Sequence, residues 1–201
     1  MINNLFDDVC QLESRLGLPT GFYEKLFKED DWSFVIKLNA LFEAACTHIL
    51  FVRLDTPELE EAIANLDFAQ KKSGKISFLR SLGALTTEQA GILRYIAELR
   101  NKLVHNVTNV TFSFSEYVAA LDKNQLNELI KNFGRGVVDT VRIDEKVILR
   151  ERFVVENPKL SLWLTAAEIL ACLYLEVDKV GLAQQRYELD ALRNFILRPA
   201  E

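Results

Sequence analysis

Apolar positions recur every three or four residues along most of the chain, which is the period of amphipathic helices. The clearest run lies in 32–54, where one helix face would carry Phe34, Leu38, Leu41, Ala45, Ile49 and Val52. A further helix, capped by Thr86 or Thr87, would carry Ile92, Leu93, Ile96, Leu99 and Leu103 on one side. The same period predicts helices over 3–16, 22–27, 75–82, 124–133, 137–155, 160–179 and 182–197. The pattern therefore predicts an all-α fold.

Helix-breaking residues divide this pattern without creating a linker. Only 8 Gly and 4 Pro occur in 201 residues, so long helices are favoured. Gly181 is expected to separate the last two helices, and Gly134-Arg135-Gly136 to form a turn between helices rather than a phosphate loop, because no strand precedes it. The stretch 107–114 alternates apolar with polar residues and predicts a short extended piece. We expect a single domain over residues 1–201.

The charge of the chain is uneven. Its net charge of −5 argues against a protein that holds nucleic acid by charge alone. The segment 69–105, however, carries +5 and the remainder −10. An anionic partner would bind at this basic segment, although a solvated helix face gives the same pattern.

Cysteine and histidine are too few and too scattered for a metal site. Cys10, Cys46 and Cys172 lie far apart, and the two histidines are His48 and His105. None stands at zinc-ligand spacing. We therefore expect no metal, no cofactor, and three free thiols in the reducing cytoplasm. His48, at the edge of an apolar helix face, is expected to be a core histidine with a hydrogen-bond partner.

Membrane attachment is not expected from the sequence. The first ten residues contain two acids and no apolar run, which is unlike a signal peptide. The longest apolar stretch, 160–175, is interrupted by Glu168 and is shorter than the ~20 residues of a membrane span. We interpret it as a buried helix.

One segment is chemically distinctive, namely Arg100-Asn101-Lys102-Leu103-Val104-His105. Arg100 stands at the edge of the apolar stripe, and burying its guanidinium would require an acid, carbonyls or a second subunit. His105 follows five positions later, so an ideal helix turns the two side chains roughly 140° apart. Either the helix unwinds near Val104, or Arg100 and His105 converge with their copies across a dimer axis.

The run from Leu99 to His105 resembles the signature of the HEPN superfamily, in which a polar residue directly follows an Arg and a His stands five positions after that Arg. The stretch 75–85, followed by the helix that bears the motif, is similar to the mannitol-repressor-type branch. The helix at 32–54 matches that arrangement in kind. The resemblance covers about 32–105 as a HEPN-like core, on which 115–198 would pack as further helices.

The resemblance implies a helical bundle that forms a homodimer and places both copies of the motif in one cleft. In catalytic members this cleft cleaves RNA without a metal. Carried over to this chain, His105 would be general base or acid at the ribose 2′-hydroxyl, because an imidazole exchanges protons near neutral pH. Arg100 would stabilise the phosphorane, and Asn101 would orient His105 or the phosphate. The RNA backbone would be held by Lys71, Lys72, Lys75 and Lys102.

The setting implied is defence, stress or a toxin with a protein antitoxin as partner. Some toxin members carry a Tyr two residues after the His, where this chain has Val107, so a modification at that position is not expected. The mannitol-repressor branch is regulatory, so a non-catalytic regulatory or protein-interaction module is the alternative, and enzymatic activity stays open.

Two structural interpretations also stay open. Asn101 and His105 would simply cap their helix, while Arg100 would pair with Glu43 or another buried acid. In addition, the apolar helix at 160–175 would pack against a different protein.

Overall fold

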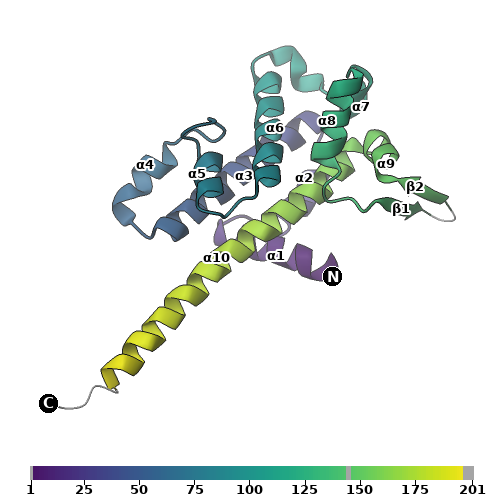
Figure 1. Ribbon diagram of the computed structural model, residues 1–201. Helices are drawn as coiled ribbons and strands as arrows, with labels where there is room; N and C mark the ends of the chain where they lie inside the picture. The colour runs from purple at the N-terminus through teal and green to yellow at the C-terminus, as the bar shows by residue number, and fades with distance from the viewer. Residues whose placement is uncertain (1, 144–145, 197–201) are drawn as a thin grey trace.

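The computed structural model describes residues 2–143 and 146–196. The chain is mostly helical, with one two-stranded hairpin among the described residues, and this confirms the all-α class (Figure 1). In chain order the elements are α1 (Ile2–Arg15), α2 (Phe22–Phe27), α3 (Asp31–Leu54), η1 (Pro57–Leu59), α4 (Glu60–Ala64), α5 (Lys75–Ser81), α6 (Thr87–Val104), η2 (Val107–Thr111), α7 (Phe114–Ala119), α8 (Lys123–Phe133), β1 (Thr140–Ile143), β2 (Lys146–Leu149), α9 (Arg150–Glu156) and α10 (Pro158–Ile196).

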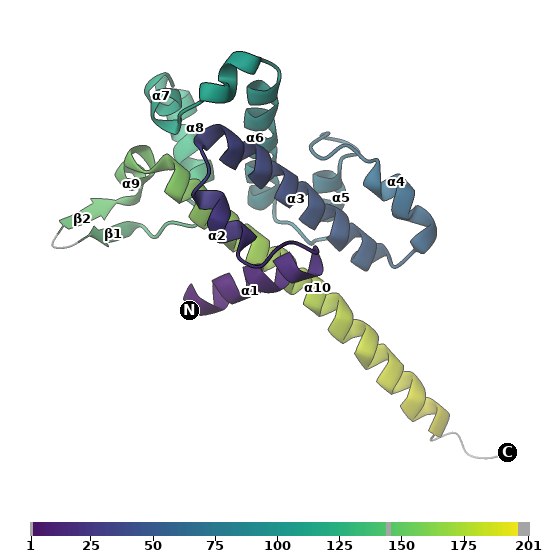
Figure 2. The same cartoon turned by 180° about the vertical axis from the view of Figure 1, so that it is seen from behind.

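Helix α3 is the centre of the fold. It begins after Asp30, whose carboxylate accepts a hydrogen bond from the Ser33 backbone N–H at 2.9 Å. Phe34, Leu38 and Ile49 are fully buried, and α5, α6 and α10 pack around the helix (Figure 2). A helix that is apolar on most sides is stable in water when neighbours cover it in this way.

Helix α10 brings segments that are far apart in the sequence into contact. It packs along α1 and α3, and Arg15 of α1 forms an ion pair with Asp178 at 2.5 Å. The expected break at Gly181 is wrong, because one helix runs from Pro158 to Ile196. A single glycine costs about 1 kcal/mol in a helix interior, which the helix-forming residues on either side can offset.

The second half of the chain is attached to the core through aromatic rings. Phe114 contacts Phe34 edge-on, with ring centroids 6.0 Å apart, and contacts Phe133 at the same distance. Tyr95 of α6 packs edge-on against Phe133 at 5.8 Å. These contacts hold α7 and α8 beside α6.

The predicted helix over 137–155 is wrong in its first part. Residues 140–143 and 146–149 form an antiparallel strand pair in which Val141 pairs with Ile148 and Arg142 with Val147. Its strands are rich in β-branched residues, which favour extended backbone. The helical part begins at Arg150, as α9.

The predicted extended piece at 107–114 is also wrong. This stretch forms the 3₁₀ helix η2, followed by the start of α7. The side-chain oxygen of Asn106 accepts a hydrogen bond from the Thr108 backbone N–H at 3.1 Å. Asn and Asp side chains commonly bond the backbone two residues on, and this turns the chain rather than extending it.

Two helices are long and apolar enough to cross a membrane by length and composition, α3 and residues 158–187 of α10. Half of the apolar window of α3 (50%) and 56% of that of α10 are buried inside the protein. Core helices of this length meet the same criteria, and the buried parts of both helices face other helices of the chain.

Candidate functional site

The motif lies at the carboxyl end of α6. The helix begins with a capping box, in which the Thr86 hydroxyl accepts from the Gln89 backbone N–H at 3.1 Å and the Gln89 side chain accepts from the Thr86 N–H at 2.9 Å. Arg100 is half-buried, and Asn101 and His105 are exposed. The apolar face of α6 thus packs inward and presents the motif at its solvent-facing end.

The motif helix stays regular to its end. It continues through Val104, and the backbone of His105 still has near-helical angles of φ −73° and ψ −13°. The expected alternative of unwinding near Val104 is therefore wrong. Arg100 and His105 therefore face different directions on the helix, and the alternative, that they converge with their copies across a dimer axis, stays a prediction.

Other residues close this end of the helix. The Trp32 indole N–H donates to the Leu103 carbonyl at 3.5 Å, and the Asn109 amide donates to the Lys102 carbonyl at 2.8 Å. The side chain of Asn101 instead accepts a hydrogen bond from Arg100 Nη1 at 3.0 Å. The expectation that the motif side chains cap the helix is not met by these contacts.

The suggested pair of Arg100 with Glu43 is wrong. The carboxylate of Glu43 lies 3.3 Å from the ammonium of Lys75, which also donates to the Ala64 carbonyl at 3.1 Å. Lys75 is only 3% exposed, so its ammonium is taken up inside the fold. Its assignment as an RNA-binding residue is corrected for this reason.

Substitutions of Lys75 and Lys72 test whether the first is buried in the fold while the second is exposed. Replacing Lys75 by alanine is expected to lower the free energy of unfolding by about 2 kcal/mol, because the buried stem loses packing and two acceptors lose their donor. Replacing the exposed Lys72 should change it by less than about 0.5 kcal/mol. Urea unfolding followed by circular dichroism measures both, and equal values would contradict the buried role of Lys75.

The remaining basic candidates are accessible. Lys71 and Lys72 are exposed in the segment before α5, and Lys102 is exposed on α6 beside the motif. The segment before α5 is shaped by Gln70, whose side-chain oxygen accepts from the backbone N–H groups of Lys72 and Ser73 at 2.7 and 2.6 Å. These lysines lie on the surface where a polyanion could reach them.

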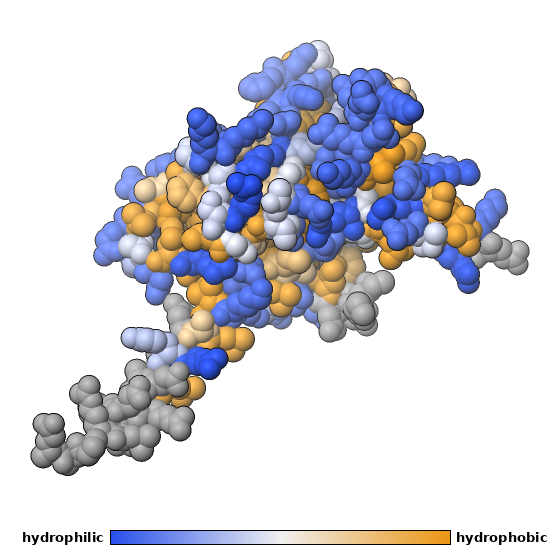
Figure 3. Space-filling model, viewed as in Figure 1, coloured by the Kyte–Doolittle hydropathy of each residue, from blue (hydrophilic) through white to orange (hydrophobic). Residues whose placement is uncertain are grey.

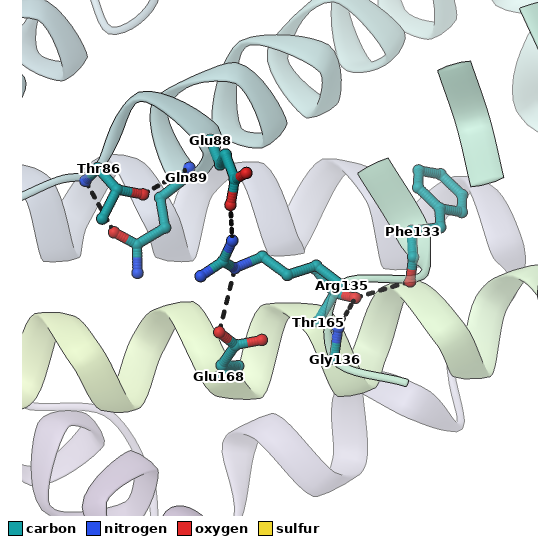
Figure 4. Close-up of polar contacts among 8 residues, drawn as sticks. All are labelled: Thr86, Glu88, Gln89, Phe133, Arg135, Gly136, Thr165 and Glu168. Atoms are coloured by element: carbon teal, nitrogen blue, oxygen red, sulfur yellow. Dashed lines mark hydrogen bonds and ion pairs between the residues drawn. The ribbon is translucent and has the colours of Figure 1, made fainter. Parts of the chain in front are cut away.

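A second polar arrangement surrounds the Gly134-Arg135-Gly136 turn, which follows α8 and leads into β1 (Figure 4). The Arg135 guanidinium forms ion pairs with Glu88 of α6 and with Glu168 of α10, the latter at 3.1 Å. A hollow of about 700 Å³ opens beside it between α6, α8, α9 and α10. Since two carboxylates already neutralise Arg135, the bridge fastens three elements rather than offering a free cation.

Gly136 belongs to the same arrangement. Its backbone N–H donates to the Thr165 hydroxyl at 2.9 Å, and that hydroxyl donates to the Phe133 carbonyl at 2.7 Å. A Cβ at Gly136 would lie 2.6 Å from backbone atoms of Leu164 and Thr165. The turn therefore needs glycine because the chain passes directly against α10, and sequence reasoning found the turn but not this contact.

His48 departs from the expected core histidine. It is half-buried, and its Nε2 is buried without a hydrogen-bond partner among the described residues. Loss of solvent, and secondarily the nearby Arg15, lower the pKa of His48 from its ordinary value near 6.5. The neutral imidazole is therefore favoured in the folded chain.

The lowered pKa of His48 predicts weaker folding in acid. Below pH about 6.5 the unfolded chain binds a proton at this imidazole more readily than the folded chain, so stability falls as the pH falls. Between pH 7 and 5 the urea midpoint of the wild type should drop more than that of His48→Asn. If the urea midpoints of the two proteins fall by the same amount, His48 does not cause the loss of stability in acid.

No protein-family model, curated protein or solved structure matches this chain. Within residues 2–143 and 146–196, no group of three or more His, Cys, Asp or Glu side chains is arranged to hold a metal ion.

Proposed function

We propose that the chain is a HEPN-like protein that dimerises and cleaves RNA without a metal ion. The observation that carries this proposal is the setting of the motif. Among the described residues, Arg100 bonds to the neighbouring Asn101 rather than to a buried acid, and His105 is exposed. Trp32 and Asn109 donate hydrogen bonds to carbonyl groups at the carboxyl end of α6, so these carbonyls are capped by residues outside the motif.

The proposed reaction is an internal transesterification of RNA. His105 of one copy accepts the proton of a ribose 2′-hydroxyl, and the 2′ oxygen attacks the adjacent phosphorus. The bond from phosphorus to the 5′ oxygen breaks, and the leaving oxygen takes a proton from His105 of the second copy. The products are a 2′,3′-cyclic phosphate and a 5′-hydroxyl end.

Arg100 and Asn101 would act on the phosphate during this step. The forked N–H groups of a guanidinium suit the crowded anionic oxygens of a phosphorane. The hydrogen bond from Arg100 to Asn101 fixes the two polar groups relative to each other on one helix turn, which supports a joint role in orienting the phosphate. Lys71, Lys72 and Lys102 would bind the backbone on either side.

The experiment that tests the proposal is cleavage of a mixed pool of structured and single-stranded RNA in EDTA. The purified protein should produce fragments that end in 2′,3′-cyclic phosphate. The fragments are separated by gel and their ends identified by mass spectrometry. No cleavage of any substrate by folded, dimeric protein would contradict the nuclease proposal.

A non-catalytic regulatory or protein-interaction module is the second candidate, and one observation favours it. The hairpin and the residues that lead into it expose four large apolar side chains, those of Val138, Ile143, Val147 and Leu149. Exposed apolar residues gathered on one projecting element are typical of protein-binding surfaces. If this candidate is right, His105 can be replaced without loss of regulation, whereas charged substitutions on the hairpin remove it.

A further inference from the structure

Helix α6 carries two arginines that the fold leaves without a carboxylate. The half-buried arginines among the described residues are Arg53, Arg94, Arg100, Arg135 and Arg150. The first and the last two form ion pairs with Glu or Asp side chains. Arg94 and Arg100 bond instead to the neutral side chains of Ser77 and Asn101. A guanidinium keeps its charge at any working pH, so one that is half-buried without an acid is suited to bind an anion from outside.

Arg94 is oriented by its contact with α5. Its Nη2 donates to the Ser77 hydroxyl at 2.9 Å, while its Nε is buried without a hydrogen-bond partner among the described residues. A guanidinium has five N–H groups, so this single bond directs the side chain and does not saturate it. A planar fork that is already oriented loses little conformational freedom when it binds a phosphate.

The Ser77 hydroxyl also connects Arg94 with the loop before α5. It donates to the Lys71 carbonyl at 2.9 Å, so Arg94 lies within two hydrogen bonds of the backbone of this loop. Lys71 and Lys72 are exposed there. Figure 3 shows mainly hydrophilic residues over this upper part of the molecule, where α6 and the loop lie. Three cations from two segments therefore share one polar surface.

Arg94 shares a face of α6 with two residues of the motif. Asn101 stands seven positions after it and His105 eleven, and both steps return an ideal helix to within about 20° of the direction of Arg94. Helix α6 continues past α5 (Figures 1 and 2), and Asn101 and His105 are exposed. The face that meets α5 at Arg94 is therefore open to solvent at the motif.

The length of this face suits a short stretch of RNA. From Arg94 to His105 the helix rises about 16 Å, and a stacked strand advances about 3.4 Å per nucleotide, so the span equals roughly five nucleotides. An unpaired strand can follow a protein surface in this way, whereas double-stranded RNA is contacted across its minor groove. A single row of cations thus fits the backbone of one strand.

We propose that Arg94, together with Lys71 and Lys72, binds the backbone of single-stranded RNA roughly five nucleotides away from the bond that is cleaved at His105. The inference rests on the proposed cleavage for the position of that bond, and it adds a binding residue outside the motif. RNA shorter than this span reaches His105 without contacting Arg94. Arg94 thereby sets the minimum length of RNA that binds tightly.

One acid stands in the path of the strand. Glu98 follows Arg94 by one turn on the same face of α6, and it is exposed. Its carboxylate would repel a phosphate, so Glu98→Gln should bind RNA about twofold more tightly. The matched control is Glu151→Gln, which removes an exposed acid from α9. A gain of the same size in both variants would contradict a path along α6.

Fluorescence anisotropy measures the contribution of Arg94. The probe is a single strand of about eight nucleotides, longer than the span, with methylated 2′-hydroxyls so that it binds the wild type without being cleaved by 2′-hydroxyl attack. Arg94→Gln should bind it about tenfold more weakly. The slope of log affinity against log salt should fall by about 0.7, the value for one phosphate contact on a single strand. An unchanged slope overturns the proposal.

Two further variants separate a phosphate contact from a structural role. Arg142→Gln removes an exposed arginine from β1, which projects on the side away from α5 (Figures 1 and 2), and it should keep the wild-type affinity and slope. Arg94→Lys keeps the charge, so its slope should stay at the wild-type value. A slope for Arg94→Lys equal to that of Arg94→Gln would show that Arg94 acts only through the fold, and it would overturn the proposal.

Probe length and cleavage complete the test. A probe of about two nucleotides, shorter than the span, should bind the wild type and Arg94→Gln equally, and a tenfold difference on this probe would contradict the distance from His105. Binding that depends on Arg94 in a protein that cleaves no RNA would retain the binding residue and reject the nuclease. Cleavage together with binding that does not depend on Arg94 would retain the nuclease and reject this inference.

Discussion

Replacing His105 by alanine is expected to lower the rate of RNA cleavage at least about 100-fold, because proton transfer by a positioned side chain contributes roughly 10²–10⁴ in rate. The imidazole stands exposed at the end of α6, so the fold should not suffer. A solvent-exposed substitution of this kind changes stability by less than about 0.5 kcal/mol. Single-turnover cleavage of one end-labelled RNA in EDTA measures the effect.

The matched control uses the other histidine of the chain. His48→Asn removes an imidazole from α3, away from the motif, and should cleave at the wild-type rate. Cyclic phosphate ends should disappear together with activity in His105→Ala. If His105→Ala cleaves as fast as the wild type, the activity comes from elsewhere and the assignment of His105 fails.

Replacing Gly136 by alanine is expected to lower the free energy of unfolding by about 3 kcal/mol, the upper range for forcing an extra group into a packed interior. The added Cβ would stand 2.6 Å from backbone atoms of α10, and backbone cannot move aside as a flexible side chain can. For a chain of this size, the melting temperature should fall by roughly 6–12 °C. Differential scanning calorimetry measures the change.

Gly91 provides the control for Gly136. It lies in α6, and a Cβ there meets no atom within 4 Å. Gly91→Ala should therefore raise stability by up to about 1 kcal/mol through helix propensity. If Gly136→Ala melts within 2 °C of the wild type, a range that corresponds to about 0.5–1 kcal/mol, the turn has room that the structure does not provide.

The sequence predicted an element correctly where residues within a few positions of its ends determine where it begins and ends. The helix at 22–27 and the Thr86 cap are found as predicted, because cap residues and apolar period act within a few positions. The strand pair of 140–143 and 146–149 was missed because its apolar residues also fit a helical period, and a short apolar run does not distinguish a strand from a helix. The helix through Gly181 was missed because propensity is a weak signal against good helix formers on both sides.

The same distinction between local and remote signals applies to the candidate site. The motif was placed correctly at the end of a helix, since its period can be read locally. The burial of Lys75 depends on Glu43, which is 32 positions away, and nothing near Lys75 signals it. Likewise, Arg135 meets acids 47 and 33 positions distant. Pairing between remote segments is set by packing, which a single sequence does not display.

The packing of α1 and α3 against α10 has a consequence for how the protein forms in the cell. Helix α1 packs on α10, and the ion-pair partner of Arg15 is Asp178, 163 positions later in the chain. Contacts of such sequence separation slow folding, because a long loop must close before they form. The part of the apolar surface of α3 that α10 covers therefore stays exposed until α10 has been synthesised. Nascent chains stalled before α10 emerges are the stage at which chaperones would be needed most.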